Sequence, residues 1–121
     1  MATTLGNFTY PQRGVLKCAW LAIPNGNDGS VVDLGPFVAD VELQITGTFG
    51  VGGSISIEGS NDGGTTYAVL NDDTGSALTF TAAALKKIKN VGVGQLRPRV
   101  TAGDGTTALN AYIIGHTQSV R

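Results

Sequence analysis

The sequence predicts an all-β domain: an antiparallel β-sandwich, jelly-roll or immunoglobulin-like, of about seven or eight short strands. Three observations predict it. Short segments alternate apolar with polar residues, Gly-Asn-Asp turn signals recur roughly every ten residues, and no segment is long enough for a crossover helix. Parallel sheets need such crossovers, so we expect antiparallel pairing.

The clearest unit is the stretch 54–70. Ile55 and Ile57 alternate with polar residues, which predicts a strand with the isoleucines toward the core and Glu58 toward solvent. The Asn-Asp-Gly-Gly segment 61–64 then reverses the chain, because these residues tolerate positive φ or bond their own backbone. We therefore expect a β-hairpin that lies on the core.

Other segments with strand character are 14–23, 31–34, 41–46, 78–80, 95–101 and 109–113. The first is apolar on both parities, which predicts a bulge or burial on both faces. The Gly-rich segment 47–53 and the turn 102–105 should each close a hairpin between the strands that flank them. Segment 82–89 has helix propensity but is too short for more than a turn or two.

The inward parity of these strands predicts the core. Pro98 shares that parity in its strand, so we expect it at a sheet edge or a bulge, because it has no N–H to donate. The single cysteine, Cys18, excludes an intramolecular disulfide and is predicted to be a small buried residue. The other predicted core residues are Trp20, Val41, Leu43, Ile45, Ile55, Ile57, Val69, Leu96, Val100, Leu109, Ala111 and Ile113.

The pattern divides the chain into an extended N-terminal arm (1–12), a sandwich domain (13–115) and a polar C-terminal tail (116–121). The arm shows no clear period yet carries Phe8 and Tyr10. These aromatic residues either fold back onto their own domain or dock on a neighbouring subunit. We expect the second, an arm that acts as a clasp.

Composition limits the class of partner. The chain has 121 residues, enough for one domain, and its charged fraction of 14% is below the roughly 25% of soluble domains. Such a surface is either rich in Ser, Thr and Asn or partly covered by a partner. The net charge of −1 gives no field for nucleic acid or a membrane, and we expect neither. No signal peptide or long apolar run is visible, so we expect synthesis in a reducing cytoplasm.

The residues offer no set of groups for catalysis. The only histidine, His116, lies near the C-terminus, where a general base would be poorly held. Glu42 and Glu58 would suit glycoside hydrolysis only if their strands were neighbours. We expect no enzyme activity, no metal and no cofactor. Whether the loops 61–64 and 103–105 bind calcium or glycans stays open.

Four further segments are characteristic: ITGTFG at 45–50, IEGSNDG at 57–63, ALTFTA at 77–82 and RPRVTAGDGTT at 97–107. Through these segments the chain from about residue 13 to 114 resembles capsid decoration (cement) proteins of tailed bacteriophages. The resemblance implies a structural virion protein on the capsid exterior, made in the host bacterial cytoplasm. It would stabilise contacts between major capsid protein subunits by many repeated weak contacts.

The implied partners are the major capsid protein and further copies of this chain, as a homodimer or homotrimer. Host, oligomer number and the capsid symmetry positions occupied stay open. The alternative is a carbohydrate-binding or adhesive module that uses loop aromatics such as Tyr67. Arginines suit bidentate bonds to carboxylates across an interface. The residues predicted for a capsid or subunit interface are Phe8, Tyr10, Arg13, Lys86, Lys87, Arg97 and Arg99.

Overall fold

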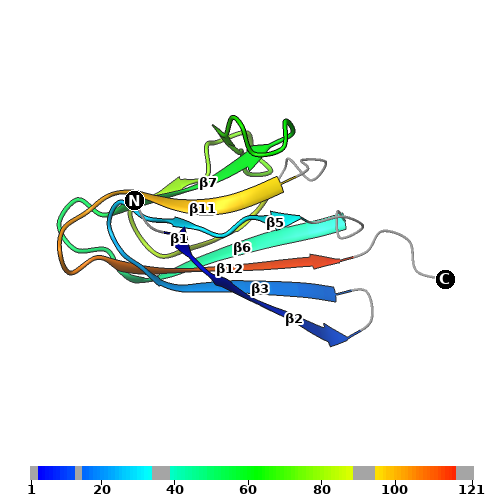
Figure 1. Ribbon diagram of the computed structural model, residues 1–121, viewed down its shortest axis with the longest axis horizontal. Coiled ribbons are helices and arrows are strands. Elements are labelled where there is room, and N and C mark those ends of the chain that lie inside the picture. Colours follow the sequence, from blue (N-terminus) through cyan, green and yellow to red (C-terminus); the bar gives the residue numbers. More distant parts are fainter. Residues whose placement is uncertain (1–2, 13–14, 34–38, 89–94, 117–121) are drawn as a thin grey trace.

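The computed structural model describes residues 3–12, 15–33, 39–88 and 95–116, and these form the all-β sandwich that the sequence predicts. Two sheets lie face to face (Figure 1). The described residues form twelve strands, more than expected, because five of them span only two residues. Within this part of the chain no helix is long and apolar enough to cross a membrane.

Strand pairing is antiparallel throughout the described residues, except that β1 and β4 run parallel. Sheet A contains, in order, β1 (Thr3–Thr4), β4 (Asp28–Gly29), β11 (Gln95–Ala102), β7 (Ser54–Ser60) and β8 (Ala68–Val69), with β5 (Val32–Asp33) on β11 and β9 (Thr79–Phe80) on β7. Sheet B contains, in order, β10 (Ala84–Lys87), β6 (Ala39–Thr48), β12 (Ala108–His116), β3 (Val15–Ile23) and β2 (Gly6–Gln12). Of the predicted tail, His116 ends β12 and 117–121 lie outside the described residues.

One apolar core lies between the sheets and contains all but one of the predicted core residues. The exception is Val69, which is 42% exposed because it pairs with Glu58 on the outer face of β7, while Leu70 beside it is buried. Cys18 is fully buried as predicted, and burial raises the pKa of its thiol to about 12. At most 1% of the surface is exposed in Trp20, Val41, Leu43, Ile45, Ile55, Ile57, Leu96, Val100, Leu109, Ala111 and Ile113.

The outward residues of β7 are buried, whereas the alternation predicts that they face solvent. Ser56 is 4% exposed and Glu58 is 7% exposed. The chain that follows β7 folds back over this face. There the hydroxyls of Ser56 and Thr79 share a hydrogen bond of 2.9 Å, and the Ser60 hydroxyl donates to Asp62 Oδ1 at 2.7 Å. The alternation assigns the side chains of β7 to the correct faces, but it does not predict that another part of the chain covers the outer face.

The hairpin over 54–70 is confirmed, because β8 pairs with β7. The hairpins expected at 47–53 and 102–105 are wrong, because both segments pass from one sheet to the other. The two connections hold each other, with the Val51 N–H donating to Asp104 Oδ2 at 3.0 Å. A turn signal predicts that the chain reverses but not which sheet the next strand joins.

The predicted bulge in the strand over 14–23 is confirmed. The register of β3 against β12 shifts between Trp20 and Ile23. Within the shift Ala22 has a positive φ of 56°, a conformation that costs energy for a residue with a Cβ. Its N–H donates to Asn110 Oδ1 at 2.8 Å, so a side chain of β12 holds the bulge in place.

The helical tendency of 82–89 is overridden by pairing. Ala84 to Lys87 form β10 along the edge of β6, and beyond them the Ile88 N–H donates to the Val41 carbonyl at 2.9 Å. Local helix propensity amounts to tenths of a kcal/mol per residue, roughly 0 to 0.7. A strand edge that offers hydrogen bonds and a buried site for Ile88 therefore decides the conformation.

The expectation that Pro98 lies at an edge or a bulge is wrong, because it pairs with Ile57 inside β11, which has neighbours on both sides. Ile57 donates its N–H to Leu78 and accepts from Leu70 on the far side of β7. The Pro98–Ile57 pair therefore exchanges no hydrogen bond. The missing donor of Pro98 points to the other side of β11, between its short partners β4 and β5.

Residues 3–12 fold back onto their own domain, which is the alternative to the expected arm, and they do not extend away from it. They form β1 and β2, which pair with β4 and β3. Gly6 permits the close approach, since a Cβ there would lie 2.8 Å from Trp20 Nε1. The Gly6 N–H donates to Ser30 Oγ at 2.9 Å. Sheet B thus continues across the expected domain boundary at residue 13, and β2 forms its outer edge.

Candidate functional site

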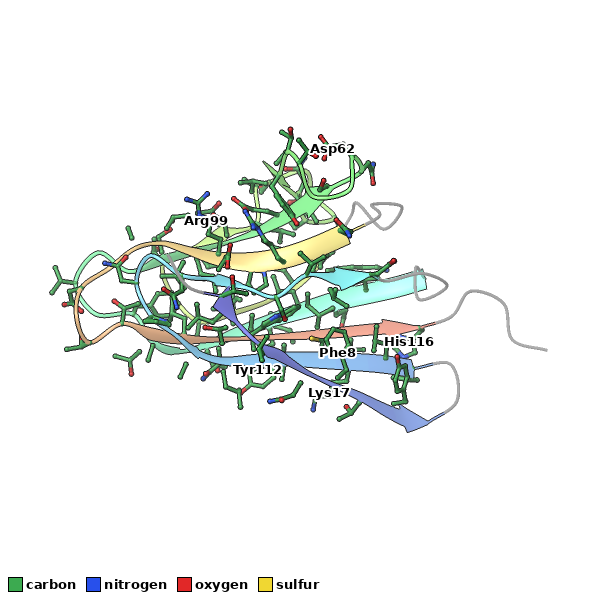
Figure 2. All side chains as sticks on the ribbon, in the orientation of Figure 1. Phe8, Lys17, Asp62, Arg99, Tyr112 and His116 are labelled. Carbon is green, nitrogen blue, oxygen red and sulfur yellow. The ribbon has the colours of Figure 1, made fainter. Side chains whose placement is uncertain are left out.

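The outer face of sheet B is open to solvent and mixes apolar with charged side chains (Figure 2). Lys17, Glu42 and Gln44 are exposed. Leu85 is 66% exposed, and Tyr112 is half-buried on the central strand β12. A face of this composition offers apolar contact, both signs of charge and hydrogen-bonding groups to a partner.

Strand register arranges these side chains in rows across the sheet, so that opposite charges flank Ile114. In the order β10, β6, β12, β3, β2, one row is Lys87, Glu42, Ile114, Lys17 and Thr9. The next row is Leu85, Gln44, Tyr112, Ala19 and Asn7.

A hollow of about 240 Å³ lies on this face, lined by Leu85, Tyr112 and Ile114 together with Lys17, Glu42 and Gln44. None of the residues predicted for an interface lines this hollow, although the sequence carries a signal for it. Tyr112 and Ile114 are large and largely apolar at the parity opposite to the buried Ile113. A strand that is apolar on both parities is typical of burial on both faces.

Arg97 lies at the centre of a charged network on the outer face of sheet A. Its Nη1 lies 2.9 Å from Asp28 Oδ2, and its Nε lies 3.1 Å from Glu58 Oε1. The guanidinium also lies over the Tyr67 ring, 3.7 Å from the centroid. Arg99 Nη1 is 3.9 Å from Glu58, and its side chain is 42% exposed. Arg97 therefore directs its Nη1 and Nε donors to carboxylates of its own chain.

The residues predicted for an interface do not form one patch. Arg13 lies outside the described residues. The others lie on edge strand β2, on the opposite edge strand β10 and on the outer face of sheet A. In that order they are Phe8 and Tyr10, Lys86 and Lys87, and Arg97 and Arg99.

Asp62, Asp72 and Asp104 each organise a turn by accepting hydrogen bonds from residues that follow them. Asp104 Oδ1 accepts from the Thr106 hydroxyl at 2.7 Å and its N–H at 2.9 Å, and Oδ2 accepts from Val51. These bonds, the Thr106 hydroxyl first, lower the pKa of Asp104 to about 2. Hydrogen bonds from neighbouring hydroxyls likewise lower the pKa of Asp62 and of Asp72.

The carboxylates considered for metal binding or hydrolysis are placed apart. Asp62 and Asp104, in the two loops considered for calcium, are acceptors of their own turns. Glu42 is exposed in sheet B, whereas Glu58 is covered in sheet A. Among the described residues no three His, Cys, Asp or Glu side chains gather where they could hold a metal ion.

Acid should weaken the Asp104 turn. The folded pKa of about 2 lies below the ordinary 3.8, so the charged turn contributes stability that is present above about pH 3.8 and is lost as pH falls through 2. We expect Asp104→Asn to melt below wild type at neutral pH, with the gap closing in this acidic window. Melting curves across that range check it, with Asp73→Asn, an exposed turn residue, as the control. A gap that stays constant with pH would contradict the assignment.

Comparisons with known proteins bear on the fold. No family model and no curated protein matches the sequence. Among solved structures the chain is similar to the SPBc2 prophage-derived protein YomS, with a TM-score of 0.61 and 12% identity over 88% of this chain and 99% of that one. A second solved structure is the carbohydrate-binding module CBM6cm-2 of Cellvibrio mixtus lichenase 5A in complex with cellotriose. Its identity is 15% over 97% of this chain and 88% of that one, and its TM-score of 0.29 is too low to carry an argument. At 12% identity, the likeness to YomS shows that the two chains share a fold.

Proposed function

We propose that this protein is a structural virion protein of a tailed bacteriophage that binds the outer capsid surface and cements contacts between major capsid protein subunits. The resemblance of its Gly- and Thr-rich segments to decoration proteins supports the proposal, as does a fold shared with a prophage-derived protein. In this role the protein needs neither catalysis nor a cofactor. It associates with the capsid protein and with further copies of itself.

The observation that carries the proposal is the edge strand β2. It is the last strand of sheet B, so one side of its backbone faces away from the sheet. Phe8 is 45% exposed and Tyr10 65%, and Leu5 just before the strand is 77% exposed. A strand edge with exposed apolar side chains is a template on which another protein can add a strand or dock. A capsid repeats the complementary surface many times, so modest contacts suffice.

The test uses particles of the phage that encodes this chain, prepared without the protein. Purified full-length protein should bind them to saturation and raise the temperature at which they release DNA. The double variant Phe8→Ser, Tyr10→Ser should bind at least about tenfold more weakly, because it loses apolar burial worth over a kcal/mol. Val51→Ser removes an apolar residue that is even more exposed, at 81%, from the connection 47–53 and should bind like wild type.

Two outcomes would overturn parts of the proposal. Protein that does not bind the particles is not a decoration protein. Decoration by the double variant as tight as by wild type would show that β2 is not the contact. The alternative, a glycan-binding module, needs an exposed aromatic platform, but Tyr67 has the Arg97 guanidinium over its ring. Binding to host surface glycans without binding to capsids would favour that alternative.

A further inference from the structure

The outer face of sheet B has a charge pattern that complements itself. Glu42 and Lys17 lie in one row on either side of Ile114, on the two strands that flank β12. Strands in a sheet are about 4.8 Å apart, so the two charged positions lie at equal distances from β12. A rotation of 180° about β12 therefore places the position of Glu42 over that of Lys17, and the reverse.

Two copies can meet face to face about a two-fold axis along β12 or about one across it. The axis along β12 places β6 of each copy over β3 of the other, so Glu42 faces Lys17 of the second copy, twice per dimer. The axis across the strands places β6 over β6 and β3 over β3, so it offers Glu42 no lysine of the second copy, and it brings like charges together when it runs through the row of Ile114. The charge pattern thus selects the first arrangement.

The same axis brings apolar residues to the centre. Ile114 and Tyr112 lie on β12, and each faces its own counterpart across the axis. Ala19, in the row of Tyr112, faces the hollow of the second copy. Leu21, two residues further along β3 and 46% exposed, adds a large apolar side chain near the same face. Burial of these groups supplies the attraction, and the charge pairs supply the register.

The area of the face suits a stable dimer. β12 spans nine residues and the sheet has five strands, so the face measures roughly 30 by 24 Å, or roughly 700 Å². A standard interface buries about 800 Å² per partner. We propose that the protein is a two-fold homodimer through the outer face of sheet B, with the axis along β12 and a Glu42–Lys17 pair on each side. This deepens the self-association in the proposed function and leaves both β2 edges outside the contact.

Sedimentation equilibrium of the purified chain at micromolar concentrations, without capsids, tests the dimer. Wild type should sediment at twice its 12.4 kDa. Lys17→Glu and Glu42→Lys each create two like-charge pairs, so each should raise the dissociation constant by roughly tenfold or more. The double variant restores opposite charges and should return to within about threefold of wild type, because the coupling of the two positions offsets their single losses.

Asp73→Lys is the matched control, because it reverses an exposed acidic residue in the turn after β8 that belongs neither to the two rows nor to the lining of the hollow. It should leave the dissociation constant unchanged. A wild type that sediments as a monomer would overturn the proposal. So would a double variant whose dissociation constant rises by the product of the two single-variant increases. A dimer insensitive to either reversal would place the interface elsewhere. Because the assay contains no capsid, its failure is distinct from a failure of capsid binding.

Discussion

Replacing Arg97 with alanine should destabilise the fold by about 3–5 kcal/mol, the cost of removing one partner from a buried ion pair. Arg97 bonds two carboxylates at once, and both are covered: the side chains of Asp28 and Glu58 are only 8% and 9% exposed. Truncation would leave two charges in a poorly solvated site without their cation. It would also remove the group that packs on Tyr67.

Chemical denaturation of the Arg97→Ala variant measures this loss, and Arg99→Ala is the matched control. Arg99 lies two residues along the same strand but is more exposed, and its Nη1 is as far as 3.9 Å from Glu58 Oε2. Its loss should therefore cost at most about 1 kcal/mol. Arg97→Lys keeps the charge without the planar fork and should fall between the two. Equal losses for Arg97→Ala and Arg99→Ala would show that the network does not depend on Arg97.

Replacing Ile57 with alanine should cost about 2–5 kcal/mol, because the side chain is fully buried between the two sheets and its removal leaves a cavity. Ile57 pairs with Pro98 on one side and bonds the backbone of Leu70 and Leu78 on the other. A packed site framed on both sides has little room to collapse, which favours the upper half of the range. Denaturant unfolding gives the value directly.

Two neighbouring variants test the assignment of faces around Ile57. Ser56→Ala removes the hydroxyl that bonds Thr79 and should cost about 1 kcal/mol, although alternation alone predicts almost no effect. Val69→Ala truncates a side chain that is 42% exposed and should cost much less than Ile57→Ala. If Val69→Ala were as costly as Ile57→Ala, the pairing of β7 with β8 would be wrong.

The sequence predicts which residues face the core because that information is local. A period of two places Ile55 and Ile57, or Leu43 and Ile45, on one face whatever the strand pairs with. The one error in the predicted core, Val69, comes from the return strand of the hairpin. There the register with β7, and not the local pattern, places Leu70 inside instead.

What the sequence does not predict depends on contacts between distant residues. The segments 47–53 and 102–105 look like hairpin turns, and only their mutual contact through Asp104 shows that both cross between sheets. Glu58 looks solvent-exposed because the arginine that covers it lies 39 residues away. The candidate dimer face was visible only as an excess of apolar residues on both parities of β12.

The place of β12 in sheet B has a consequence for how the protein is made. This strand is the last element of the described chain to leave the ribosome, yet it lies between β6 and β3 and pairs with both. Until it emerges, sheet B is two separate halves, each with a strand edge and an apolar face exposed. Sheet B can therefore close only after β12 has emerged, with the slow kinetics of long-range pairing. A cell that makes many copies at once must keep these unfinished chains apart.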